Sequence, residues 1–163
     1  MFKFSYLDKS QKNEILPMLF DIFYDNMSII VQGISSYESE RSEFLSEVSH
    51  ALEKEPRKII LCHCKGELAG FLMYYTRENL LMIEEVQLKK EHQKTMAFYR
   101  LCAFLVANLP KGIENIESFV HKENSNSLSI QAKLGMEIID SKNPKFHHLQ
   151  GDANKIRYRF ERG

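Results

Sequence analysis

Two strand-like runs, each followed by a helical pattern, occupy the second half of the chain and constrain its fold more than any other feature. The first run covers residues 83–88, and a long apolar helical pattern follows over residues 93–109. The second run covers residues 113–121 and leads into a shorter helix between Asn124 and Gly135. Asparagine is a favoured helix N-cap, and glycine is favoured just past a helix C-terminus. The spacing predicts strands that alternate with helices packed on a sheet.

The N-terminal part predicts a strand followed by a helix. Residues 2–6 alternate apolar and polar side chains, as a half-buried strand does. Apolar residues at helical spacing continue as far as Met27, with Asp8 and Gln11 as a capping box at the start. Pro17 lies inside this pattern and is expected either to kink the helix or to mark its true start.

The rest of the chain predicts a second helix, a hairpin and further strands. The helix is expected over residues 39–55, ended by Pro56, and the segment 28–38 before it is expected to be a mobile loop. Lys65-Gly66 separates two strand-like runs, which is a strong hairpin signal. The remaining strands are expected at residues 57–64, 67–76, 80–88, 137–140 and 155–160, with a polar loop over residues 141–154.

These elements predict an α/β fold in the order β-α-α-β-β-β-α-β-α-β-β. The order indicates one mixed sheet, of the α+β kind, with helices on both faces. A length of 163 residues makes a single domain over residues 1–163, and 44% hydrophobic with 27% charged residues is ordinary for a globular protein.

Charge and apolar patterning exclude several classes of function. The chain has 22 Lys and Arg against 22 Asp and Glu, so it lacks the positive excess that non-specific nucleic-acid binding needs. No apolar stretch approaches the roughly 18–20 residues of a membrane span, and the first residues have no signal-peptide core. Three cysteines do not make a disulfide framework. We expect a soluble, cytoplasmic protein without a nucleic-acid or membrane partner.

Cys62-His63-Cys64 has the composition of a metal site but not its geometry. In a strand the two thiols share one face, and the imidazole points to the other. A structural zinc needs four ligands, and no second Cys/His pair has the usual spacing. We expect the cysteines to be buried small hydrophobic side chains, with no bound metal.

Residues 83–136 carry motifs at a spacing that random sequence rarely supplies. They are Ile83-Glu84-Glu85-Val86-Gln87-Leu88, then Gln93, then Asn124 and Lys133-Leu134-Gly135-Met136. They resemble the acyl-CoA-binding half of the GNAT superfamily of N-acyltransferases, which typically reads I-E-E-L-x-V-x-P-E-Y-Q-G-x-G-x-G and then N-x-x-A-x-x-x-Y-E-K-L-G-F. The predicted element order is also the GNAT order. The chain departs from the pattern where Met96 and Phe98 replace glycines and Gln131 replaces tyrosine.

The resemblance implies acetyl-CoA as co-substrate and a place for it. In GNAT proteins the strands matching residues 80–88 and 117–121 separate, and the acyl-pantetheine arm lies in the gap, bonded to strand backbone. The pyrophosphate lies over the N-terminus of the following helix, where free N–H groups and the helix dipole favour anions. The residues that this assigns to the cofactor are Val86, Gln87, Leu88, Gln93, Lys94, Thr95, Met96, Ala97, Phe98 and Asn124.

The two replaced glycines leave alternatives open. In one, Phe98 starts the apolar stripe of its helix with Met96 packed beside it, and no cofactor is present. In the other, both side chains point away from the phosphates while the backbone still donates, and Lys94 and Thr95 add a charge and a hydroxyl donor. Asn124 is likewise either a pantetheine contact or only a helix cap.

The resemblance also assigns catalytic positions. Gln131 stands where the family's tyrosine often protonates the departing thiolate, and a neutral glutamine cannot act as an acid. Tyr99 and Tyr158 are the candidates to replace that tyrosine. Glu84 and Glu85 are predicted to point to opposite faces of their strand. One of them is a candidate base for the amine, and an ordinary strand-end carboxylate is the alternative for each.

Two functions from different classes follow. The first is an N-acetyltransferase that moves an acetyl group to an unidentified primary amine, small molecule or peptide, with a strand amide near residues 86–88 polarising the thioester carbonyl. The second is a GNAT-fold module that has lost catalysis and binds CoA or a protein partner in a regulatory role. His147-His148 is expected to be solvated or to border the acceptor pocket. The sequence leaves the oligomeric state undecided, with a homodimer as one alternative.

Overall fold

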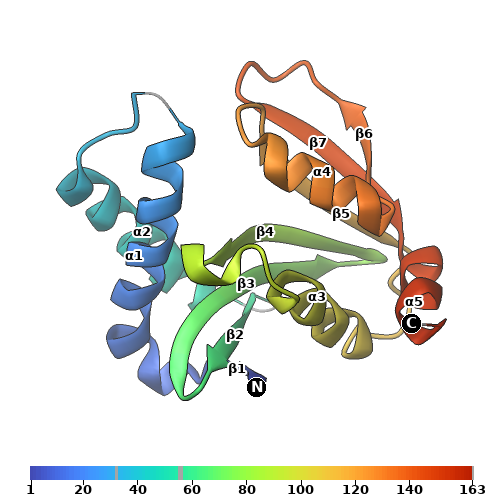
Figure 1. Cartoon of the computed structure of the whole chain (residues 1–163), viewed down its shortest axis with the longest axis horizontal. Helices are drawn as coiled ribbons and strands as arrows, with labels where there is room; N and C mark the ends of the chain where they lie inside the picture. Colours follow the sequence, from blue (N-terminus) through green and yellow to red (C-terminus); the bar gives the residue numbers. More distant parts are fainter. Residues whose placement is uncertain (32, 55–56, 163) are drawn as a thin grey trace.

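The computed structural model describes residues 1–31, 33–54 and 57–162 and shows one seven-stranded mixed sheet with helices on both faces (Figure 1). The strand order in the sheet is β1-β2-β3-β4-β5-β7-β6. The elements are β1 (Phe2–Tyr6), α1 (Lys12–Ile30), α2 (Tyr37–Glu53), β2 (Lys58–Cys64), β3 (Glu67–Arg77), β4 (Leu80–Leu88), α3 (Ala97–Ala107), β5 (Asn115–His121), α4 (Ser125–Leu134), β6 (Glu137–Asp140), β7 (Phe146–Asp152) and α5 (Ala153–Arg162), with 3₁₀ turns η1 (Lys9–Gln11) and η2 (Lys90–His92). The predicted fold class is confirmed.

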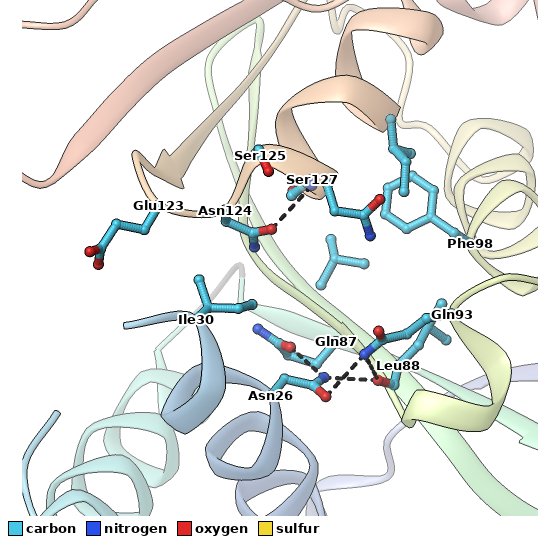
Figure 2. Close-up of a pocket in the computed structure, with 13 residues that line it drawn as sticks. Asn26, Ile30, Gln87, Leu88, Gln93, Phe98, Glu123, Asn124, Ser125 and Ser127 are labelled. Carbon is cyan, nitrogen blue, oxygen red and sulfur yellow. Dashed lines mark hydrogen bonds between the residues drawn. The ribbon is translucent and has the colours of Figure 1, made fainter. Parts of the chain in front are cut away.

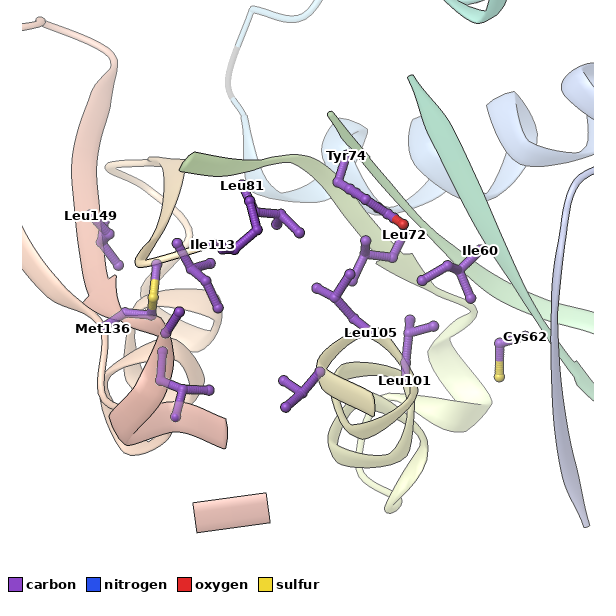
Figure 3. Close-up of a cluster of buried hydrophobic side chains, with 14 of the residues drawn as sticks. Ile60, Cys62, Leu72, Tyr74, Leu81, Leu101, Leu105, Ile113, Met136 and Leu149 are labelled. Carbon is purple, nitrogen blue, oxygen red and sulfur yellow. The ribbon is translucent and has the colours of Figure 1, made fainter. Parts of the chain in front are cut away.

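The strands β2 and β3 are buried on both faces, so their apolar runs are nearly continuous. Ile59 and Leu61 pack with α1 and α2, whereas Ile60 and Cys62 pack with α3 on the other face (Figure 3). Alternate side chains of a strand point to opposite faces, so one short run contributes to two cores. Cys62 is fully buried, as predicted.

Local turn and cap signals were predicted correctly around the site. Lys65 and Gly66 both have positive φ, at 53° and 81°, as a two-residue hairpin turn requires. The side chain of Asn124 accepts a hydrogen bond from the Ser127 N–H and begins α4. Gly135, with φ 103°, ends that helix.

The N-terminal helices differ from the prediction at their ends. Asp8 accepts from the Ser10 N–H and caps the turn η1, rather than forming a capping box with Gln11. The helix α1 begins at Lys12, so Pro17 is not its start. It continues to Ile30, and α2 already begins at Tyr37, which makes the predicted loop shorter. The predicted end of α2 at residues 55–56 lies outside the described residues.

The C-terminal prediction was wrong in two elements. Residues 155–160 belong to α5 instead of a strand, and the predicted polar loop contains β7. Ile156 and Phe160 are four residues apart and pack inward from a helix, although their alternation with polar residues also fits a strand. The Asp152 carboxylate accepts from the Asn154 and Lys155 N–H groups and caps α5.

The helix after β4 also starts later than predicted. The chain forms η2 first, and α3 begins at Ala97 instead of residue 93. The N-cap residue of α3 is Met96, and the Thr95 hydroxyl accepts from the Ala97 N–H, the first of the helix, at 3.2 Å. None of the described helices is both long and apolar enough to cross a membrane.

Candidate functional site

The parallel strands β4 and β5 separate part of the way along their length. They pair from Leu80 with Asn115 to Ile83 with Ser118, and the pairing stops there. A β-bulge lies at that point: Ile83 pairs with Tyr74 of β3 and Glu85 with Met73, which leaves Glu84 as the extra residue. A bulge bends its strand, and Figure 1 shows β5, β7 and α4 standing apart from the end of β4. The strand separation implied by the resemblance is present.

Two adjoining cavities occupy the opening. The loop cavity, of about 260 Å³, lies among the ends of α1 and β4, the start of α3 and the start of α4 (Figure 2). The strand cavity, of about 440 Å³, lies between β4 and β5 and also meets α1, α4 and β7. The two share the lining residues Val86, Gln87, Asn124 and Ser127. They therefore form one slot that reaches from the start of α3 to the α1 face of the sheet.

The structure brings together six of the ten residues predicted to bind the cofactor. Those that line the loop cavity are Val86, Gln87, Leu88, Gln93, Phe98 and Asn124. The four that do not line it are Lys94, Thr95, Met96 and Ala97. Ala97 is fully buried, and the Thr95 hydroxyl donates to the His92 carbonyl at 2.6 Å. The Thr95 hydroxyl therefore bonds to backbone groups on both sides of it, and its hydrogen is already engaged.

Each of the two alternatives holds for one residue: Phe98 joins the apolar stripe of α3 and lines an apolar cavity with Cys102 and Leu105, whereas Met96 lies outside the loop cavity. Phe98 lines the loop cavity from α3, so it does not point away from the slot (Figure 2). Met96 is 56% exposed and does not pack into the core beside it. The helix begins only at Ala97, which turns Met96 outward and brings Phe98 into the first turn that faces α4. The aromatic ring narrows the slot on the α3 side.

A buried amide network joins α1, β4 and the segment before α3. Asn26 of α1 donates to the Leu88 carbonyl at 2.8 Å and to Gln87 Oε1 at 2.9 Å. Gln93 Nε2 donates to the same carbonyl and to Asn26 Oδ1, each at 3.0 Å (Figure 2). Sequence reasoning missed Asn26. Its signal was a polar residue on the buried stripe of α1, four residues after Ile22.

The network also shows which backbone groups of β4 face the slot. The Leu88 carbonyl is bonded to Asn26 and Gln93, away from β3. Alternate residues of an antiparallel strand direct their backbone groups to the same side. The N–H and C=O of Val86 therefore also face away from β3, at a level where β4 no longer pairs with β5. This is unpaired strand backbone at the wall of the slot.

We expect Asn26→Ala to lower the free energy of unfolding by about 2 kcal/mol, because buried partners lose a donor or acceptor. Urea unfolding measures this loss through a lower midpoint with an unchanged slope. Asn13→Ala, an exposed position of the same helix, is the matched control. A change for Asn26→Ala no larger than that of the control would mean that water replaces the amide.

Both candidate base residues line the strand cavity, which corrects the prediction of opposite faces. The bulge at Glu84 inserts one residue and so shifts the alternation of side chains. Glu84 forms an ion pair with Arg57, whose guanidinium lies 4.3 Å from the centre of the Tyr75 ring. The other oxygen, Glu84 Oε1, is buried and has no hydrogen-bond partner among the described residues.

Glu85 has the environment of a carboxyl that titrates near neutrality. Gln87 Nε2 donates to Glu85 Oε1 at 2.6 Å. Burial raises the pKa of Glu85 to about 7; the Gln87 hydrogen bond opposes this, and the charge of Glu84 adds to it. A carboxyl with this pKa in a cavity is a candidate for proton transfer.

Gln131 of α4 is buried and lines the strand cavity at the position where the family has tyrosine. Its Oε1 accepts from the Ser118 hydroxyl at 2.6 Å, and its Nε2 donates to the Ser127 hydroxyl at 3.1 Å. Tyr99 packs on Phe160 of α5 with ring centres 4.9 Å apart, and Tyr158 is 59% exposed. Neither tyrosine lines the slot, so neither replaces the missing acid.

The two histidines, predicted to be solvated or to border the acceptor pocket, lie on β7 and both contact other side chains. His148 Nε2 is 2.5 Å from Glu117 Oε1, and its ring stacks on Phe119 of β5 with centres 4.5 Å apart. His147 Nδ1 is 2.7 Å from the Ser141 hydroxyl. Within the described residues no group of three or more His, Cys, Asp or Glu side chains is placed to hold a metal ion.

Comparison with known proteins shows the fold class. No family model and no curated protein matches the chain. Among solved structures, PaiA N-acetyltransferase from Thermoplasma acidophilum in complex with coenzyme A is similar with a TM-score of 0.75 and 18% identity, over 93% of this chain and 99% of that one. A GNAT-family acetyltransferase from Staphylococcus aureus Mu50 has a TM-score of 0.73 and 11% identity, over 94% and 99%. The ribosomal-protein-S18-alanine N-acetyltransferase from Escherichia coli has 0.68 and 13%, over 94% of each chain. The chain has the GNAT fold.

Proposed function

We propose that this chain is an N-acetyltransferase that moves the acetyl group of acetyl-CoA to a primary amine by direct attack. The observation that carries the proposal is the separation of β4 from β5 beyond Ile83 and Ser118, which opens a slot with strand backbone in its wall and two carboxylates in its lining. The likeness to acetyltransferase structures, one of them with coenzyme A, supports it. The acceptor is a small-molecule or peptide amine.

The slot suits an extended arm that carries amide groups. Such an arm pairs with the unpaired N–H and C=O of Val86 as a peptide strand pairs with a sheet edge. Asn124 lines both cavities while its Oδ1 caps α4. Phosphate groups would lie toward the start of α3, where backbone N–H groups and the helix dipole favour anions. Phe98 limits how closely they approach.

Glu85 supplies the base in this proposal. The acceptor ammonium first gives one proton to the Glu85 carboxylate. The neutral amine nitrogen then attacks the thioester carbonyl carbon and forms the C–N bond, and its second proton passes to water. A pKa near 7 keeps the ionised form populated at neutral pH, which suits a general base. The backbone N–H of Val86 faces the slot and is the strand amide placed to polarise the carbonyl.

The departing sulfur takes its proton from water in this proposal. The C–S bond breaks to release a thiolate, which solvent then protonates. Gln131 has no proton to lose at neutral pH and instead holds the Ser118 and Ser127 hydroxyls. A thiolate is a good leaving group, so the missing tyrosine slows transfer without preventing it.

A second candidate is a CoA-binding module without catalysis. It is favoured by Gln131 in the tyrosine position and by the placement of Tyr99 and Tyr158 outside the slot. The two candidates differ in turnover and agree in ligand binding. An assay of thiol release from acetyl-CoA with added amines separates the two candidates, because a module without catalysis binds acetyl-CoA but releases no free thiol.

We expect millimolar acetyl-CoA to raise the melting temperature, since a ligand that binds only the folded state stabilises it by about 2.7 kcal/mol at 100 times its Kd. Differential scanning calorimetry measures the shift. Lys94→Ala should weaken binding by no more than about 1 kcal/mol, because Lys94 does not line the loop cavity. Absence of any shift or binding heat at this concentration would remove both candidates.

A further inference from the structure

The strand cavity has an acidic lining. Its charged lining residues are Glu84 and Glu85, and no Lys or Arg among the described residues belongs to the lining. Arg57 is outside it, held between Glu84 and the Tyr75 ring. His121, the remaining titratable group in the described lining, accepts from the Glu123 N–H through its Nδ1.

The oxygen Glu84 Oε1 lacks a donor, since the described residues do not provide one. A buried acceptor without a partner is costly, and native proteins leave few of them. The Oε1 atom itself is covered by protein, but Glu84 and Glu85 both line the cavity, so the two carboxyl groups make its wall negatively charged. A positively charged ammonium in the cavity complements this charge.

Aromatic side chains line the same cavity as these carboxylates. Phe119 is 52% exposed, yet its ring is fixed by stacking on His148 at 4.5 Å and 20° between planes. Glu117 anchors His148 in turn, at 2.5 Å. Phe146 of β7, beside the His121 ring, and Phe23 of α1 also line the cavity. An exposed phenylalanine held in one orientation is a surface on which a flat ring can stack.

We propose that the acceptor is a cationic primary amine that carries an aromatic ring, with the ammonium at Glu84 and Glu85 and the ring against Phe119. This rests on the proposed acetyltransferase function and adds the substrate class. An acceptor with a carboxylate next to its amine is disfavoured, because that group would be placed beside two acidic side chains. Phe119 is the specificity-determining residue, and His148 is a positioning residue that acts through it.

Three amines test the proposal. Phenethylamine has the ring and the cation, butylamine lacks the ring, and phenylalanine adds a carboxylate. We expect kcat/KM for phenethylamine to be about tenfold or more above the value for butylamine. It should be about 100-fold above the value for phenylalanine. Equal values for phenethylamine and butylamine would overturn the aromatic part, and preference for phenylalanine would overturn the cationic part. Either result leaves acetyl transfer itself intact.

Substitutions test which residues cause the preference for an aromatic amine. Phe119→Leu should raise KM for phenethylamine about tenfold and leave butylamine unchanged, while Tyr158→Leu, an exposed ring on α5, should change neither. His148→Leu should give the same loss of ring preference as Phe119→Leu, and His148→Gln should restore part of it through Glu117. An unaltered ratio in Phe119→Leu would refute the assignment.

A binding measurement keeps the proposal testable without turnover. Calorimetric titration of CoA-saturated protein with phenethylamine and butylamine should give the same order of affinity, with Phe119→Leu removing the difference. A protein that does not transfer acetyl groups but still binds phenethylamine more tightly than butylamine would contradict the proposed acetyltransferase function and support the proposed class of amine. A protein that acetylates amines but binds the two amines equally would support the acetyltransferase function and contradict the proposed class of amine.

Discussion

Replacement of Glu85 by glutamine is expected to lower kcat by about 100-fold or more and to raise KM for the acceptor as well, because it also removes one of the two charges beside the ammonium. The amide keeps the shape of the side chain and can still accept from Gln87, but it cannot take the proton of the attacking amine. A lost general base costs about 10²–10⁴-fold in rate. Glu84→Gln is the matched variant, because it removes a neighbouring charge that Arg57 already engages. That variant should raise KM and lower kcat far less.

The pH dependence of the rate is an independent test of the role of Glu85. Wild-type kcat/KM should rise with pH through about 7, as Glu85 loses its proton in the free protein. The charged and titratable groups that face it are Glu84 with its partner Arg57 and, across the strand cavity, His121. The Glu85→Gln variant should lose this limb of the profile and keep any limb that belongs to the amine. A variant that retains both the rate and the limb would assign the base elsewhere.

Local sequence signals were sufficient for the elements that build the slot. β4 has the bounds predicted for it, Leu80–Leu88, because its apolar run is closed by a turn on one side and charged residues on the other. α4 lies between Asn124 and Gly135, since an N-cap and a left-handed glycine define it independently of the rest of the fold. The prediction failed for β7 and α5, where Ile156 and Phe160 fit either period and only packing decides.

The chemistry of the site depended on contacts that sequence patterns do not contain. The bulge at Glu84 comes from the pairing of β4 with β3, and it shifts the alternation of side chains where Glu84 and Glu85 line the cavity. The network of Asn26 with Leu88 joins residues 62 positions apart. The Phe119–His148 stack likewise requires β5 and β7 to pair. In each case the tertiary register, which local propensity does not encode, places the functional group.

The substitution that removes catalysis should also stabilise the fold. The pKa of Glu85 is about 7 in the folded protein against a usual value of 4.5. Between these two values the folded state holds more protons than the unfolded state, so stability falls as pH rises from 4.5 to 7 and stays lower above 7. Glu85→Gln has no carboxylate to bury. It should therefore unfold at higher urea than wild type at pH 8, by about 3 kcal/mol in free energy of unfolding, and by less than about 1 kcal/mol at pH 5.

Two control variants separate this effect from general changes of charge. Glu84→Gln loses the ion pair with Arg57 and should be less stable than wild type at pH 8. Glu47→Gln, on the exposed side of α2, should be neutral at both pH values. If Glu85→Gln raises the free energy of unfolding at pH 8 but not at pH 5, the Glu85 carboxylate destabilises the fold when it is ionised. Such a cost in stability is typical of groups kept for function. A Glu85→Gln protein no more stable than wild type at pH 8 would show instead that Glu85 is solvated in the folded state and is not the base.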